Sequence, residues 1–202
     1  MLGQFAPHTT RRMVPVRLIQ TGLWQWMQGT GIERFELLRM PHEWVLRGTI
    51  IASAEAGPAE ARYEILCDDS WQTRRADISL RDETAERVLQ VTIEDGEWYA
   101  NGRVNETVAG CRDIDLEWSP STNTIPIRRL RLPIGERSGP LIAAWVRFPQ
   151  LTLQPLLQEY EHISELHYRY SSNAGQFVAE IVVDEEGMVL NYEGLWQRAA
   201  AK

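Results

Sequence analysis

Short segments in which hydrophobic and polar residues alternate run through most of the chain. Residues 61–67 are one example, because Tyr63, Ile65 and Cys67 share one face, with Arg62, Glu64 and Leu66 on the other. This period of two is that of a half-buried β-strand. Similar segments follow one another at spacings of about 8 to 12 residues, and turn residues such as those at 94–96 separate them. The pattern therefore predicts a mainly β protein.

One stretch, residues 110–133, places an acidic segment directly before a basic one. In its first half Asp113, Asp115 and Glu117 alternate with apolar residues. Side chains two positions apart lie on the same face of a strand, so three carboxylates should share one surface. This acidic strand is the first candidate for a functional site.

The second half of the stretch carries the one convincing helical pattern. At about 100° per residue, the apolar and the basic side chains fall on opposite sides: Pro126, Ile127, Leu130 and Ile134 against Arg128, Arg129 and Arg131. We expect the helix to begin at Ile125 or Pro126 and to end before Pro133. A side-chain oxygen of Asn123 or Thr124 is expected to cap its first turn.

From these elements we predict a many-stranded antiparallel sheet that curls around a single short α-helix in a barrel-like way. Residues 23–202 should form this one domain, since no repeat, linker or shift in composition divides the chain. Residues 1–22 are expected to be a loosely ordered tail, with a later start at Met13 as the alternative. A weaker helical pattern covers residues 154–160. Exposed sheet edges favour the pairing of two chains.

Composition and motifs exclude several classes of protein. The net charge of −7 disfavours a nucleic-acid binder, and no apolar run resembles a signal peptide or a membrane span, so a cytoplasmic protein is expected. Cys67 and Cys111 lack the spacing of a zinc site and are expected to be buried free thiols rather than a disulfide. No motif of a hydrolase, nucleotide-binding protein or metalloprotease is present. No metal or cofactor is therefore expected.

The acidic strand and the arginines of the helix allow two interpretations. Carboxylates, amides and guanidinium groups can bind sugar hydroxyls or anionic head groups, with tryptophan rings against the apolar face of a sugar. The alternative is a solvated face or a structural network of ion pairs, which is common and in which each pair contributes little. We expect Trp71, Trp98 and Trp145 to lie in the core.

Three blocks of the sequence resemble one bacterial family: WQWMQGTGIERFEL, GCRDIDLEWSPSTNTIPIRRLRLPIGE and FVAEIVVDEEGMVLNYEGLW. The family is known as putative glycolipid-binding and was formerly a domain of unknown function. The resemblance covers about residues 24–198. It implies a sheet curled around one helix, assembly as a homodimer, a distant likeness to lipoprotein carriers, and an acidic pocket that receives a glycolipid.

We therefore expect a non-enzymatic binder of a glycolipid or a related amphiphile, linked to glycolipid or cell-envelope metabolism. Its sheet would hold the acyl part. The chemistry of the matching blocks assigns six residues to the pocket: Glu33, Asp113, Asp115, Asn123, Arg128 and Arg129. Two alternatives stay open. One is a hydrolase that acts on a glycoside or lipid ester through Asp113 and Asp115; the other is a dimeric scaffold for protein interactions.

Overall fold

A computed structural model describes residues 15–54 and 57–201, and in these residues it contains one sheet and one α-helix. The strands are β1 (Arg17–Trp26), β2 (Gly31–Met40), β3 (Glu43–Ala54), β4 (Gly57–Asp68), β5 (Thr73–Arg81), β6 (Glu86–Glu94), β7 (Glu97–Ala100), β8 (Arg103–Val104), β9 (Asp113–Leu116), β10 (Leu141–Arg147), β11 (Thr152–Ser164), β12 (His167–Ser172), β13 (Phe177–Val183), β14 (Val189–Tyr192) and β15 (Trp196–Ala201). The helices are the 3₁₀ turns η1 (Glu106–Val108) and η2 (Ser121–Asn123), followed by α1 (Thr124–Leu130). The predicted fold class is confirmed.

All fifteen strands belong to a single sheet. Its order runs from β8 down to β1 and then from β15 down to β9, so the first and last strands of the chain are neighbours in its middle. Every pairing is antiparallel except that of β9 with β10. Most connections are therefore hairpins between sequence neighbours. The parallel strands β9 and β10 are instead connected by the segment that carries η2 and α1.

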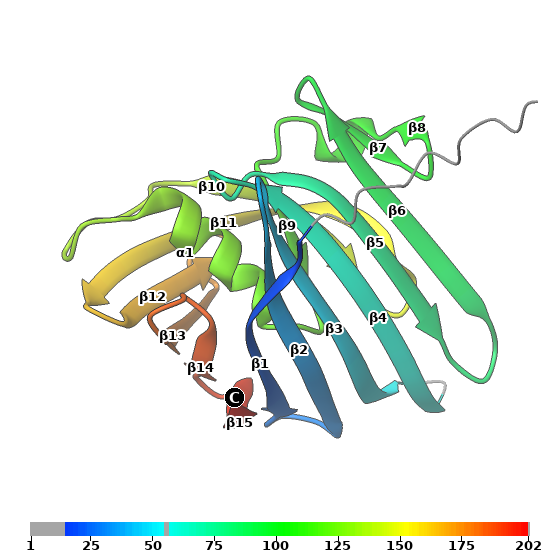
Figure 1. Ribbon diagram of the computed structural model, residues 1–202, viewed down its shortest axis with the longest axis horizontal. Coiled ribbons are helices and arrows are strands. Elements are labelled where there is room, and N and C mark those ends of the chain that lie inside the picture. The colour runs from blue at the N-terminus through cyan, green and yellow to red at the C-terminus, as the bar shows by residue number, and fades with distance from the viewer. Residues whose placement is uncertain (1–14, 55–56, 202) are drawn as a thin grey trace, which may run out of the picture.

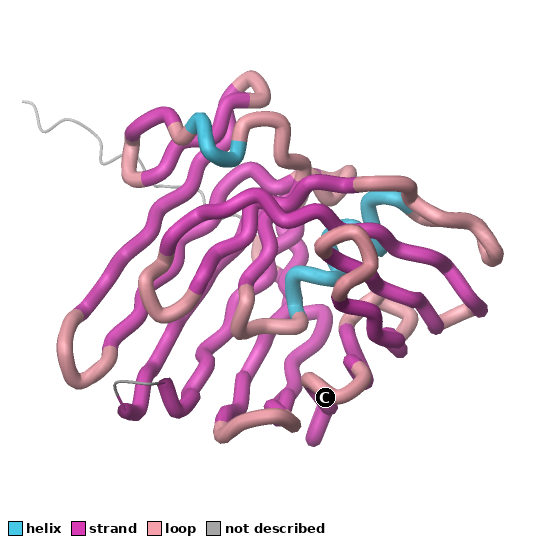
Figure 2. Tube along the Cα trace, turned by 180° about the vertical axis from the view of Figure 1, so that it is seen from behind, coloured by secondary structure: helices cyan, strands magenta, loops and turns pink. Residues whose placement is uncertain are grey.

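The sheet curls so that β1–β6 form one wall and β10–β13 the other, with α1 between them (Figure 1). The opposite view shows the same two walls meeting through β14 and β15 (Figure 2). Twisted strands coil in this way, and the register shifts in β1, β4 and β11 add local bending. Among the described residues, no strand pairing closes the sheet. Its β9 edge contacts the other wall through a hydrogen bond from the Ile114 N–H to Thr73 Oγ1 (3.3 Å).

Aromatic side chains fill the hollow between the walls, and glycines make room for some of them. Trp24 and Phe35 stack with ring centroids 3.8 Å apart. Gly48 lies against the ring of Tyr63, where a Cβ atom would come within 2.6 Å of it. Any larger residue at position 48 would displace that ring, so the glycine is required by the close approach of the two strands.

Helix α1 closes the hollow and is buried on every side in its first turn. Ile125 is fully buried, and the Thr124 hydroxyl donates to the Gly187 carbonyl across the hollow (2.9 Å). The helix begins one residue before the earlier of the two predicted positions. The predicted cap by Asn123 is wrong, because this side chain bonds to Tyr160 and Pro120 instead.

The helix ends at Leu130, before Pro133 as predicted, but a different residue stops it. Arg131 adopts a left-handed backbone conformation (φ 48°) and so stops the helix two residues before Pro133. The weaker helical pattern at 154–160 proves to be part of β11. Pro155 is tolerated there because β12 pairs with β11 only from Gln158 onward, which leaves one side of the strand without a neighbour.

The start of the domain lies upstream of the predicted boundary. Strand β1 begins at Arg17 and pairs with β2 along most of its length, so residues 17–22 belong to the sheet. The Thr21 hydroxyl also donates to the Phe35 carbonyl (2.8 Å). The first fourteen residues of the predicted tail lie outside the described residues.

Two further expectations concern the cysteines and the membrane. Cys67 and Cys111 are both free and buried, and burial raises the pKa of each thiol. Among the described residues, no helix has the length and apolarity to cross a membrane.

The position of Ile125 predicts how much the helix contributes to stability. Ile125→Ala should leave a cavity between the two walls and lower the free energy of unfolding by about 2–5 kcal/mol. Urea unfolding followed by tryptophan fluorescence measures the change. Ile134→Ala is the matched control, because its side chain is 61% exposed. Equal effects of the two substitutions would contradict a helix that is packed into the core.

Candidate functional site

A cavity of about 290 Å³ opens on the concave side of the sheet, between the acidic strand and the C-terminal wall. We call it the Asp115 cavity. It is lined by Asp115, Leu116, Glu117, Ser119, Asn123, Trp145, Leu156, Tyr170, Ser172, Asn173, Phe177, Tyr192, Leu195 and Trp196. Five of these residues are aromatic and two are acidic, and none of the described lining residues is Lys, Arg or His.

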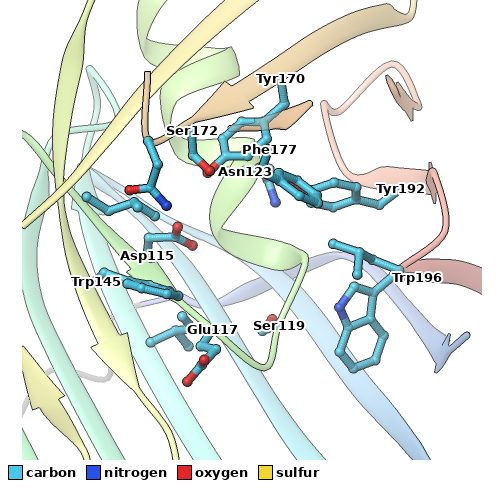
Figure 3. A pocket seen from close by; sticks show the side chains of 14 residues that line it. Asp115, Glu117, Ser119, Asn123, Trp145, Tyr170, Ser172, Phe177, Tyr192 and Trp196 are labelled. Atoms are coloured by element: carbon cyan, nitrogen blue, oxygen red, sulfur yellow. The ribbon is translucent and has the colours of Figure 1, made fainter. Parts of the chain in front are cut away.

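Figure 3 shows Asp115 and the aromatic rings of the C-terminal strands on different sides of this cavity. Asp115 and Trp145 lie on one side, and Tyr192 and Trp196 lie on the other (Figure 3). The acid comes from β9, whereas the rings come from β10 and from the C-terminal strands. The curl of the sheet is therefore what brings the two together.

Asp115 is held in place by two side chains. Its Oδ1 accepts a hydrogen bond from the Thr122 hydroxyl (2.8 Å), and its Oδ2 accepts one from the Gln158 amide (2.6 Å). Burial raises the pKa of Asp115 to about 6, although both hydrogen bonds act in the opposite direction. The carboxyl is therefore mostly ionised at neutral pH and titrates just below it.

Asp113 lies on the same face of β9, but its carboxylate is already occupied. The Arg129 guanidinium donates to both of its oxygens, at 2.8 and 2.6 Å. Such a bidentate pair fixes both groups, and neither residue lines the Asp115 cavity. This arrangement does not favour a hydrolase that uses Asp113 and Asp115 as its two carboxyl groups.

Glu117, the third acid of the strand, is also paired. The Arg147 guanidinium lies 3.0 Å from one of its oxygens, and the Phe148 N–H donates to the other (2.8 Å). Arg147 also lies over the Trp145 ring, 4.0 Å from its centroid. Trp145 was expected to lie in the core. It is only partly buried and lines the cavity.

Glu33 lies behind the cavity rather than in it. Its side chain is fully buried, and one oxygen accepts hydrogen bonds from the hydroxyls of Tyr63 and Ser119, the latter at 2.9 Å. The other oxygen has no hydrogen-bond partner among the described residues. Burial raises the pKa of Glu33 to about 8, so the carboxyl is mostly neutral at pH 7. Ser119 connects this group to the cavity, because it lines the cavity wall.

The two remaining predicted residues lie on different sides of the helical segment. Asn123 lines the Asp115 cavity and accepts a hydrogen bond from the Tyr160 hydroxyl (2.9 Å). Arg128 lines a second cavity of about 320 Å³ and donates to the Glu185 carbonyl (3.2 Å). Of the six predicted residues, the fold thus brings Asp115 and Asn123 to one cavity, with Glu33 behind it. The ligand-binding role of all six stays a prediction.

The aromatic lining was missed by the sequence analysis. Tyr170, Phe177, Tyr192 and Trp196 come from four strands near the end of the chain. Their only signal in the sequence is the density of aromatic residues after position 167, which equally fits a core. The strand order, and not the sequence pattern, places these rings opposite Asp115.

Comparison with known proteins gives one family and one solved structure. The family model described as "Putative glycolipid-binding" matches residues 21–198. A crystal structure of a DUF1089 family protein from Pseudomonas aeruginosa is similar, with a TM-score of 0.76 and 29% sequence identity. The alignment covers 98% of this chain and 99% of that chain. No curated protein matches the sequence.

The buried Glu33 predicts how stability depends on pH. Because its pKa is raised from 4.5 to about 8 on folding, its stabilising contribution is full below about pH 4.5 and is lost as the pH rises through 8. Glu33→Gln should remove this loss, which amounts to at most about 1.4 kcal/mol per pH unit. Urea unfolding of both proteins at a series of pH values measures it. The exposed Glu86→Gln is the control, and an identical pH slope for wild type and Glu33→Gln would contradict the prediction.

Proposed function

The chain belongs to the putative glycolipid-binding family, and from this premise we propose that it binds a glycolipid or a related amphiphile in the Asp115 cavity without chemical conversion. The observation that carries the proposal is the lining of this cavity, in which five aromatic rings surround a small number of fixed polar groups. Sites for small amphiphilic molecules have this composition. Aromatic rings cover the apolar face of a sugar or the first carbons of a chain, and the polar groups orient the hydroxyls.

The size of the cavity restricts which part of the ligand it takes. At about 290 Å³ it lies at the lower limit of the roughly 300–1,000 Å³ of small-molecule sites. The space between the two walls is filled by α1 and by core side chains. We therefore place the head group and the first carbons in the cavity, and the rest of the chain at the mouth beside Asn173 and Leu195. Each buried CH₂ group contributes about 0.8 kcal/mol.

The polar groups suited to the head group are those that line the cavity or stand behind it. Asp115 and Asn123 are held by hydrogen bonds and present polar atoms to the cavity. Glu33 supports Ser119 from behind. Asp113 and Arg129 engage each other, so their role in this proposal is to hold β9 against the helix. A link to glycolipid or cell-envelope metabolism follows from the class of ligand.

We further propose that the protein is a bacterial cytoplasmic homodimer. Its two free thiols fit a reducing compartment. Strand β7 pairs with β6 only from Val91 onward, which leaves an edge with Val88 exposed, and such edges favour association.

Light scattering after size exclusion should give twice the chain mass of 23.2 kDa, and Val88→Lys should lower the measured mass toward that of a single chain. A monomer at all concentrations would contradict the dimer.

Binding can be tested with protein purified from a bacterial lysate. Native mass spectrometry should detect a bound amphiphile. Addition of a matching glycolipid at about 100 times its Kd should stabilise the protein by about 2.7 kcal/mol, which raises Tm by roughly 5–10 °C for a chain of this size. The proposal fails if no lipid co-purifies and no glycolipid raises Tm.

A variant that fills the mouth of the cavity separates binding there from binding elsewhere. Leu195→Trp should abolish both the bound lipid and the gain in Tm, because the larger ring occupies the mouth. Ile134→Trp is the matched control, since it adds the same ring at an exposed position that does not line the cavity. An unchanged gain in Tm for Leu195→Trp would place the ligand outside the Asp115 cavity.

A further inference from the structure

The three carboxylates of the acidic strand differ in how their charge is balanced. Asp113 has Arg129 as a bidentate partner, and Glu117 has Arg147. Asp115, between them, has hydrogen bonds from two neutral side chains and no basic partner among residues 15–54 and 57–201. Asp115 and Glu117 both line the cavity, and of these two only Glu117 has an arginine partner among the described residues. The charge of Asp115 is therefore the one that the protein leaves uncompensated.

An uncompensated carboxylate in a partly buried position is costly, because burial disfavours the charged form. The raised pKa of Asp115 expresses this cost. The charge is usually balanced by a cation from the same chain, as it is at Asp113. Here the cavity in front of the carboxylate contains no basic side chain among the described residues that line it. The remaining source of a positive charge is the molecule that enters the cavity.

The opposite side of the cavity suits such a charge. Tyr170, Phe177, Tyr192 and Trp196 line it, and three of these rings meet edge to face or at a tilt, with centroids 5.9 to 6.3 Å apart. The faces of aromatic rings attract cations, and a carboxylate combined with several rings is how proteins recognise ammonium groups. A phosphate or sulfate head group would instead meet the Asp115 carboxylate and no basic side chain among the described lining residues. The net charge of the chain, −7, also favours the approach of a cation.

We propose that the head group taken by the Asp115 cavity carries a positively charged amino group, which pairs with the Asp115 carboxylate and lies against the aromatic wall. This inference rests on the proposed function and names its ligand class: a single-chain or double-chain amphiphile with an amino-sugar or other ammonium head group. Thr122 and Gln158 act as positioning residues, because they fix the two oxygens of Asp115 toward the cavity.

Such a pair makes binding depend on pH in a defined direction. The ammonium group favours the ionised carboxylate, so binding should weaken as the pH falls through the pKa of Asp115, about 6. The other titratable groups near Asp115 are Asp113 on β9, Glu117 directly after it, and the phenols of Tyr160, Tyr170 and Tyr192, whose pKa values the Asp115 charge helps to raise. Both acids have arginine partners, and burial raises the pKa of each phenol further above its usual value. Asp115 is therefore the group that titrates near pH 6.

The test uses three amphiphiles with the same decyl chain: decyl 2-amino-2-deoxyglucoside, its N-acetyl form and decyl glucoside. Isothermal titration is carried out below the micelle concentration and just above the pKa of Asp115, where its carboxylate is ionised and the amine is protonated. We expect the amino form to bind at least about tenfold more tightly than the two neutral forms. One pH unit below the pKa of Asp115, this preference should fall by about tenfold.

Asp115→Asn removes the charge and keeps the shape of the side chain. It should bring the three affinities to within about twofold of one another. Glu159→Gln is the matched control, because it removes one negative charge from the strand that holds Gln158 but does not line the Asp115 cavity; the preference should survive it. Circular dichroism and Tm verify that both variants fold.

The outcomes distinguish this inference from the proposed function. If decyl glucoside and the N-acetyl form bind as tightly as the amino form, the cationic head group is overturned and the amphiphile site stands. If the preference for the amino form persists in Asp115→Asn, a residue other than Asp115 recognises the ammonium group, and the inference is overturned as well. If none of the three amphiphiles binds or raises Tm, and no lipid co-purifies, the proposed function fails and this inference fails with it.

Discussion

The structure depends on how one very wide sheet covers its own apolar face. Fifteen strands in a single sheet leave a long apolar surface, and a sheet must bury such a surface against another layer. Here the sheet twists until β1–β6 and β10–β13 face each other, and the segment from Ser119 to Leu130 fills the space between them (Figure 1). The absence of a second layer is thus compensated by curling and by one inserted segment.

This segment also determines where polar chemistry can exist inside the hollow. Its backbone and side chains need partners once they are buried, and they find them on both walls. Thr124 reaches Gly187, Asn123 reaches Tyr160, and Ser119 reaches Glu33. Arg129 holds the neighbouring strand β9 through Asp113. Two of the polar residues that line the cavity, Ser119 and Asn123, are therefore a consequence of inserting this segment between the two walls.

The two unusual carboxyl groups follow from the same arrangement but differ in their surroundings. Glu33 points inward from β2, has only hydroxyl partners and is mostly neutral at pH 7 because it is fully buried. Asp115 lies at a cavity that opens to solvent, has an amide and a hydroxyl as partners, and stays mostly ionised. Depth of burial, and not the chemical type of the residue, separates the mostly neutral Glu33 from the mostly ionised Asp115, which lines a cavity.

The sequence by itself determined the β class, the approximate position of most strands, the single short helix and the acidic face of β9, because each depends on the local periodicity of side chains. Local pattern placed the start of the helix one or two residues late and offered 154–160 as a weaker helical candidate, because a proline on an unpaired side of a strand leaves little periodic signal. It also did not indicate that the left-handed Arg131, before Pro133, stops the helix. Only the tertiary structure decided which arginine neutralises which acid. It alone set Asp115 apart from Asp113 and Glu117, and brought rings from β12 to β15 opposite it. Those contacts join residues distant in the chain, and no local pattern records them.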